Sequence, residues 1–132
     1  MNIENIVGRF NAVTHWKSSE GEAGSFASEE EVRFDGGRIE FVYPDAKDTL
    51  RSAVIGSQDN AIHLQGRFGP GRLFILEQSL ILEYEAEVNG RLEKNTDVWV
   101  FADQGVSRHG VIRQPHRTIW FEARLSRLCQ TG

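Results

Sequence analysis

Residues 79–113 read SLILEYEAEVNGRLEKNTDVWVFADQGVSRHGVIR, and they carry the clearest strand and turn signals of the chain. Apolar and acidic side chains alternate from Leu80 to Val88, which is the period of two that is typical of a strand with one apolar face. Asn89-Gly90 follows, and this pair strongly predicts a hairpin because both residues tolerate the positive φ of a tight primed turn. Residues 91–101 and 106–113 then form two more strands, joined by a turn at 103–105. The stretch therefore predicts a meander of three long strands.

The rest of the chain repeats this pattern of strands and tight turns. The further strands that we expect are Ile6–Lys17, Ser25–Phe34, Arg38–Tyr43, Thr49–Ile55, Ala61–Phe68, Arg72–Leu76 and Thr118–Leu125. Arg72–Leu76 is either a separate strand or the start of the strand at Leu80, reached across a bulge near Glu77-Gln78. Nine or ten strands with no helix predict an all-β protein. Consecutive hairpins favour an antiparallel up-and-down β-barrel of roughly eight to ten strands, because closure removes exposed sheet edges. We expect one domain over residues 1–132, with a tail from about residue 126.

Composition excludes several classes of function. A net charge of −4 over 132 residues argues against nucleic acid as a partner, since phosphate contacts need a basic face. No apolar run approaches the ~18 residues of a membrane span, and the first residues lack the pattern of a signal peptide. Cys129 is the single cysteine, so an internal disulfide is excluded and a reducing cytoplasm is the expected compartment.

A few residues at the two ends of the chain resemble a known family. Gly8-Arg9-Phe10 opens the first strand, and Arg124 or Arg127 lies at the end of the last. This arrangement resembles the calycin superfamily, which includes lipocalins and fatty-acid-binding proteins, where a Gly-x-Trp packs beneath a C-terminal arginine. Phe10 stands where that pattern has Trp, and the second and third lipocalin signatures are absent. The resemblance implies a calycin-like barrel with a ligand cavity.

The Asn89-Gly90 hairpin has two candidate registers. If only these two residues form the loop, Leu80 lies opposite Trp99 and Glu85 opposite Lys94, an opposite-charge pair. A three-residue loop with a bulge instead sets Glu85 against Glu93. A slip of one residue moves every side chain to the other face. We favour the two-residue turn and keep the bulged loop as the alternative.

The favoured register places polar side chains inside the barrel. With a three-residue turn at Asp103-Gln104-Gly105, Trp99 lies opposite His109. The ligand-binding residues that we then expect on the inner face are Tyr84, Asn95, Asp97, Trp99, Phe101, His109 and Arg113. Unpaired charges are costly in a filled core, whereas apolar walls with a few polar groups are typical of a small-molecule site.

These residues suggest several functions. The leading one is binding of a small, partly apolar ligand, whose anionic group Arg113 would hold. An alternative is an isomerase, cyclase or lyase that uses Asp97 and His109 as an acid–base pair; the S-type phycobilin lyases have a similar strand plan. A third is a non-catalytic structural or protein-interaction module that forms a homodimer through an exposed strand edge. The four histidines lack metal-motif spacing, so we expect neither a metal nor a cofactor. Glu29–Glu31 is interpreted as a solvated strand face.

Overall fold

The computed structural model describes residues 3–56, 61–65 and 68–128. These residues form ten strands and two 3₁₀ helices. The strands are β1 (Gly8–Ser18), β2 (Ala23–Asp35), β3 (Arg38–Tyr43), β4 (Asp48–Ser52), β5 (Ala61–Gln65), β6 (Phe68–Ile75), β7 (Ser79–Val88), β8 (Arg91–Ala102), β9 (Gly105–Arg113) and β10 (Thr118–Arg127). The 3₁₀ helices are η1 (Ile3–Asn5) and η2 (Pro44–Ala46). A search of the described residues finds no helix with the length and hydropathy of a membrane span.

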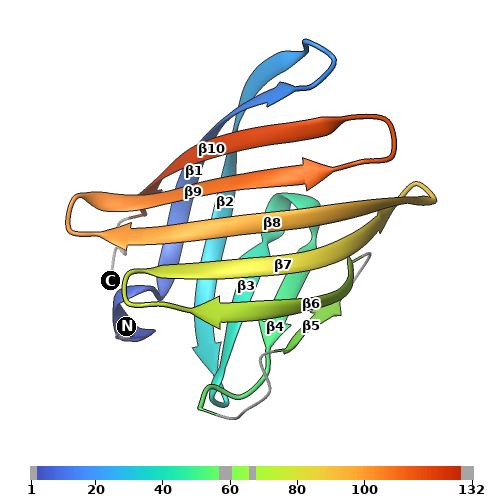
Figure 1. The fold of residues 1–132 in the computed structure, drawn as a ribbon. Coiled ribbons are helices and arrows are strands. Elements are labelled where there is room, and N and C mark those ends of the chain that lie inside the picture. Colours follow the sequence, from blue (N-terminus) through green and yellow to red (C-terminus); the bar gives the residue numbers. More distant parts are fainter. Residues whose placement is uncertain (1–2, 57–60, 66–67, 129–132) are drawn as a thin grey trace.

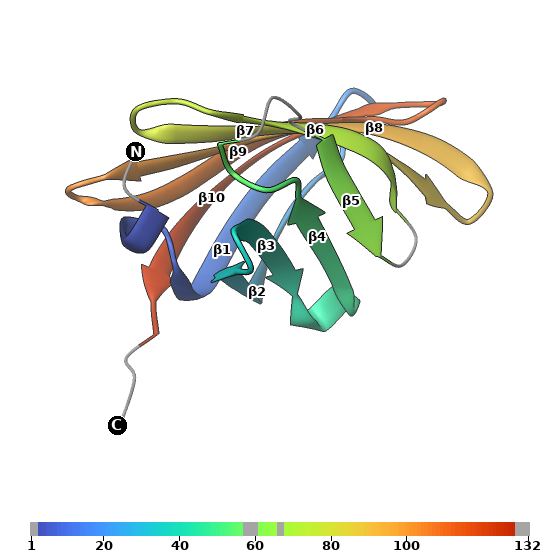
Figure 2. The same ribbon diagram turned by 90° about the horizontal axis from the view of Figure 1, so that it is seen from below.

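The ten strands close into one antiparallel barrel. Each strand pairs with its neighbours in sequence, and β1 also pairs with β10 along a register that runs from Phe10–Arg127 to Ser18–Ile119. β7, β8, β9 and β10 cross one side of the barrel, and β1 to β4 lie on the other (Figures 1 and 2). The predicted all-β, up-and-down barrel is therefore confirmed.

The hairpin between β7 and β8 has the two-residue turn that the sequence favours. Val88 pairs with Arg91, and Leu80 with Trp99. Asn89 and Gly90 have φ angles of 52° and 75°, the left-handed conformation that a primed turn requires. The bulged alternative is therefore wrong.

Two other boundaries differ in detail from the sequence prediction. The Leu76 amide donates to the Ser79 carbonyl at 2.8 Å, which closes a turn and makes β6 a strand separate from β7. The strand β10 continues to Arg127, past the expected start of the tail. Cys129 lies outside the described residues.

The core is organised around Trp99, whose side chain is fully buried. Its ring lies 6.4 Å from the ring of Phe10 and 5.5 Å from that of Phe41, between centroids, and it stacks on Phe101 at 6.1 Å. Other buried apolar side chains from both sides of the barrel complete this cluster: Ile6, Val32, Ile39, Leu50, Leu73, Leu80 and Leu82.

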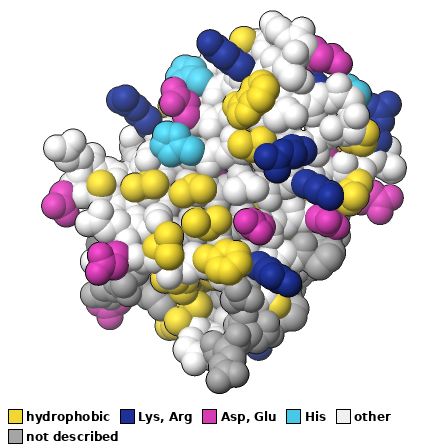
Figure 3. All heavy atoms as spheres, viewed as in Figure 1, with side chains coloured by type: hydrophobic (Ala, Val, Ile, Leu, Met, Phe, Trp, Pro, Cys, Tyr) yellow, Lys and Arg dark blue, Asp and Glu magenta, His cyan; other side chains and the backbone are white. Residues whose placement is uncertain are grey.

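Hydrophobic side chains also gather on one part of the outer surface. Figure 3 shows them over the strands that face the viewer in Figure 1. The strand register sets Phe74, Ile81 and Val98 side by side across β6, β7 and β8, and 36% of Phe74 is exposed.

Candidate functional site

Five of the seven residues predicted for the interior occupy inner or partly buried positions. Asn95, Asp97 and Trp99 are buried on β8, whereas Tyr84 on β7 and Phe101 on β8 are partly buried. Their alternation with more exposed neighbours is the pattern expected of the inner face of a barrel. Whether these residues contact a ligand stays a prediction.

His109 and Arg113 do not join this group, because the turn between β8 and β9 is shorter than expected. Ala102 pairs with Gly105, so the turn has two residues rather than three. The resulting slip of one residue sets Arg108 opposite Trp99 and moves His109 opposite Val98. His109 and Arg113 are exposed, and Arg108 is buried in their place.

The expected acid–base pair is therefore not formed. Asp97 is 1% exposed and pairs along the ladder with Gly110, whereas His109 pairs with Val98. Successive residues of a strand point to opposite faces, so Asp97 and His109 lie on opposite sides of the barrel wall.

Arg108 forms a buried ion cluster with two carboxylates. Its Nε donates to Asp97 Oδ1 at 3.1 Å, and its Nη2 contacts the other oxygen of the same carboxylate. Its Nη1 contacts Glu30 Oε1 on β2. The guanidinium also lies over aromatic rings, with Cζ 4.8 Å from the Trp99 centroid and 5.5 Å from the centroids of Tyr43 and Phe121. These contacts fix Arg108 across the barrel interior.

The charges of this cluster perturb one another. Burial would lower the pKa of Arg108, but Asp97 and Glu30 raise it well above its usual value. Burial raises the pKa of the Glu30 carboxyl, and this effect together with repulsion from Asp97 exceeds the opposing effect of Arg108. Among the described residues, buried polar atoms without a hydrogen-bond partner include Glu30 Oε2, Tyr43 Oη and Trp99 Nε1. Glu30 is therefore not the solvated side chain that the Glu29–Glu31 run predicts; it is 4% exposed.

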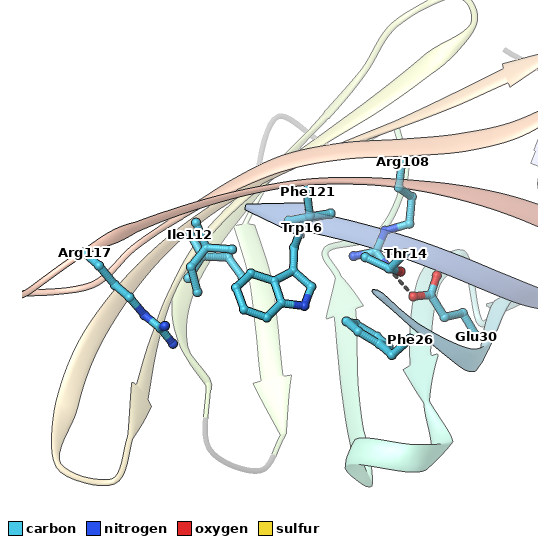
Figure 4. A pocket seen from close by; sticks show the side chains of 9 residues that line it. Thr14, Trp16, Phe26, Glu30, Arg108, Ile112, Arg117 and Phe121 are labelled. Atoms are coloured by element: carbon cyan, nitrogen blue, oxygen red, sulfur yellow. Dashed lines mark hydrogen bonds and ion pairs between the residues drawn. The ribbon is translucent and has the colours of Figure 1, made fainter. Parts of the chain in front are cut away.

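A pocket of about 330 Å³ lies between β1, β2, β9 and β10, next to this cluster. Its walls are mostly apolar, and its lining residues are Thr14, Trp16, Phe26, Glu30, Arg108, Ile112, Arg117, Ile119 and Phe121. Figure 4 shows Glu30 and Arg108 toward one end of this space, Arg117 toward the other, and the Trp16 ring between them.

Two glycines allow aromatic side chains of the pocket wall to pack closely against the neighbouring strand. A Cβ atom at Gly24 would lie 2.8 Å from the Trp16 Nε1, and one at Gly110 would overlap the Phe121 ring. The indole and the phenyl ring therefore pack directly against bare backbone of the neighbouring strand. Both positions keep the rings back from the centre of the pocket.

The arginine at the open end of the pocket already has partners. Arg117 Nη1 lies 2.5 Å from Glu22 Oε1, and its Nε donates to Gln114 Oε1 at 2.7 Å. The hydrogen bonds from Arg117 and Ser18 lower the pKa of Glu22. This network joins the β1–β2 loop to the β9–β10 turn.

The residues that suggested a family resemblance also meet in space. The Arg127 guanidinium lies over the Phe10 ring, 4.9 Å from Cζ to the centroid, and its Nη1 donates to the Val7 carbonyl at 2.7 Å. A side chain at Gly8 would collide with this guanidinium. Arg124, the other candidate, pairs along the ladder with Val13 rather than with Phe10. The arginine that covers the first strand is therefore Arg127.

Sequence reasoning missed the pocket, although part of its signal was present. Under the period of two, Trp16 falls on the same face of the first strand as Phe10, and Phe121 falls on the same face of the last strand as Ile119. Pairing of the first and last strands in a closed barrel sets these two rings opposite each other. Glu30 gave no such signal, because Glu29 and Glu31 beside it are also acidic and only the fold distinguishes them.

Comparisons with known proteins support the fold. No protein-family model and no curated protein matches the chain. Among solved structures, the S-type phycobiliprotein lyase CPES from Guillardia theta is similar, with a TM-score of 0.55 and 10% sequence identity. The match covers 98% of this chain and 92% of that chain. At this identity the likeness shows the fold alone, an antiparallel β-barrel.

Proposed function

We propose that this protein is a calycin-type barrel that binds a small, partly apolar molecule in the pocket between β1, β2, β9 and β10. The observation that carries the proposal is the combination of an apolar, aromatic-lined space of about 330 Å³ with a buried ion cluster at one end. Ligand sites in proteins usually combine apolar walls with a few fixed polar groups. This volume is at the lower end of such sites, which span roughly 300–1,000 Å³.

The pocket supports binding more directly than catalysis. The proposed acid–base pair of Asp97 and His109 is separated by the barrel wall. An enzyme of the isomerase, cyclase or lyase type remains the second candidate, because the Glu30 carboxyl lines the pocket and has a raised pKa. Such an enzyme would convert a bound molecule, whereas a binding protein would return it unchanged.

The first test is native mass spectrometry and an absorbance scan of freshly purified protein, in which one retained small molecule per chain is expected. A matched pair of variants then locates the site with an uncharged, solvent-sensitive naphthalene dye. Ile112→Trp fills the pocket and should abolish the fluorescence increase of the dye. Val111→Trp changes the adjacent residue on the opposite face of β9 and should leave it intact. Equal dye binding by both variants would place the site elsewhere.

A homodimer and a cytoplasmic location stay predictions. Each described strand has a hydrogen-bonded neighbour on both sides. Among the described strands, none therefore offers a fully unpaired edge for the predicted dimer. The outer row of Phe74, Ile81 and Val98 is the alternative surface for self-association. Light scattering of wild type and of Phe74→Glu would show a dimer and its loss.

A further inference from the structure

The ion cluster beside the pocket has one positive group for two carboxylates. Arg108 contacts both Asp97 and Glu30, and the three side chains belong to residues that are at most 8% exposed. With both carboxylates ionised, the cluster has a net charge of −1 in a region shielded from water. A buried charge of this kind is costly unless a proton or a cation compensates it.

One carboxylate of the cluster belongs to a residue that lines the pocket. Glu30 lines the pocket, and its Oε1 faces Arg108, whereas its Oε2 is buried without a hydrogen-bond partner. Both oxygens of Asp97 are occupied by Arg108. Glu30 therefore holds the one carboxylate oxygen of the cluster that has no hydrogen-bond partner.

The cations that line the pocket are already paired. Arg108 is shared by two carboxylates, and Arg117 is bound by Glu22 and Gln114. Arg113, which the sequence suggested as a holder of an anion, is exposed and does not line this pocket. The charges around this pocket therefore disfavour an anionic ligand.

The walls of the pocket also suit a positive charge. Trp16, Phe26 and Phe121 line it, and the faces of aromatic rings attract cations through their quadrupoles. Phe121 already has one cation near it, since Arg108 Cζ lies 5.5 Å from its ring centroid. Aromatic rings around a carboxylate are the usual means of binding an ammonium group.

We propose that the ligand of this pocket carries a positively charged nitrogen, an amine or a protonated heterocycle, on a compact apolar body, and that its N–H donates to the Glu30 carboxylate. This inference rests on the proposed function and specifies the chemical class of the ligand. The apolar body packs against Trp16 and Phe121, and the aromatic rings surround the nitrogen.

Binding of such a cation exchanges with a proton. Without a ligand, uptake of a proton by Glu30 would neutralise the cluster. Burial raises the pKa of Glu30 above 4.5, and Asp97 acts in the same direction while Arg108 opposes both. The remaining titratable groups that face Glu30 are Tyr43 and Tyr84, whose pKa values burial raises, so they stay neutral. Affinity for a cation should therefore rise as the pH rises through the pKa of Glu30, and one proton should be released.

The test compares three probes with the same ring: 2-(aminomethyl)naphthalene, 2-methylnaphthalene and 2-naphthoate. Wild type should bind the amine at least tenfold more tightly than the other two, by calorimetry at pH 7. Glu30→Gln should remove this preference and keep the binding of 2-methylnaphthalene. Glu29→Gln is the matched control, because the Glu29 carboxylate is next to Glu30 in the sequence but pairs with Arg9 at the surface. This variant should bind the three probes as wild type does.

The outcomes separate this inference from the proposed function. If wild type binds the amine and 2-methylnaphthalene equally, or prefers 2-naphthoate, the pocket binds ligands but the inference of a cation is wrong. If none of the three binds, the proposed function itself fails for this pocket. Calorimetry of wild type with the amine, in two buffers of different ionisation enthalpy at pH 5, needs no variant. The two buffers should give different binding enthalpies, as proton release requires. Equal enthalpies would show that the amine does not exchange with a proton.

Discussion

Removal of the Arg108 guanidinium is the most direct test of the buried cluster. Arg108→Met keeps an unbranched side chain of similar length but leaves Asp97, which is 1% exposed, and Glu30, which is 4% exposed, without their cation. Breaking a buried pair in this way costs roughly 3–5 kcal/mol, because an uncompensated charge stays in the interior. With an unfolding entropy of about 2.1 cal/mol/K per residue, that cost should lower Tm by roughly 10–18 °C for a chain of 132 residues.

Urea unfolding followed by tryptophan fluorescence measures this free energy at several pH values. The cost should be largest at pH 7 and smaller near pH 4, because burial raises the pKa of Glu30 and its protonation removes part of the unpaired charge. Arg33→Met is the control, since Arg33 pairs with Glu31 at the surface at 2.9 Å, and exposed pairs contribute about 0–1 kcal/mol.

Neutralising the whole cluster provides a second comparison. The triple variant Asp97→Asn, Glu30→Gln, Arg108→Met should recover most of the lost stability, because no charge is then left buried. A cost below about 1 kcal/mol for Arg108→Met at pH 7, or a cost that is the same at pH 4 and pH 7, would refute the assignment of a buried ion cluster.

Three further changes test other features. Asn89→Pro should destabilise by roughly 3 kcal/mol or prevent folding, because proline fixes φ near −65° where Asn89 has +52°; wild-type melting would contradict this turn, and Asn89→Gly should be tolerated. Glu30→Gln should gain stability relative to wild type between pH 4 and pH 7. A raised pKa means that the contribution of Glu30 is complete below pH 4.5 and is lost as the pH rises through its folded value; a constant difference in urea unfolding would contradict it. Gly110→Ala should push the Phe121 ring into the pocket, cost about 1–3 kcal/mol and weaken naphthalene-dye binding; unchanged dye titration would show that this ring does not border the site.

The sequence predicted the barrel and the inner positions on β7 and β8, but not those on β9, for physical reasons that can be named. Asn89-Gly90 supplies two residues with positive φ, and this fixed the register of β7 and β8, including the buried places of Asp97 and Trp99. The next turn has only Gly105 as a special residue, and a glycine there fits equally as the last loop residue or the first strand residue. Because of this ambiguity, the sequence predicted His109 at the inner position opposite Trp99, which Arg108 occupies in the structure.

The pocket could not be derived in the same way. Its aromatic walls come from strands at opposite ends of the chain, and two of its rings pack against Gly24 and Gly110, where a Cβ atom would collide with them. Glu30 is buried because Arg108 faces it across the barrel, a contact between residues 78 positions apart. Alternation within one strand does not report such a contact.

The pairing of β1 with β10, which closes the barrel, determines when the pocket can form during folding. Paired residues such as Phe10 and Arg127 lie more than a hundred positions apart, so this pairing must overcome a large entropy of loop closure and should form late and slowly during folding. The pocket uses both of these strands, and a ribosome completes β10 last of all the strands. A nascent chain therefore cannot form the pocket until β10 has emerged, and until then the inner aromatic rings lack the cover of the closed barrel and are exposed to chaperones.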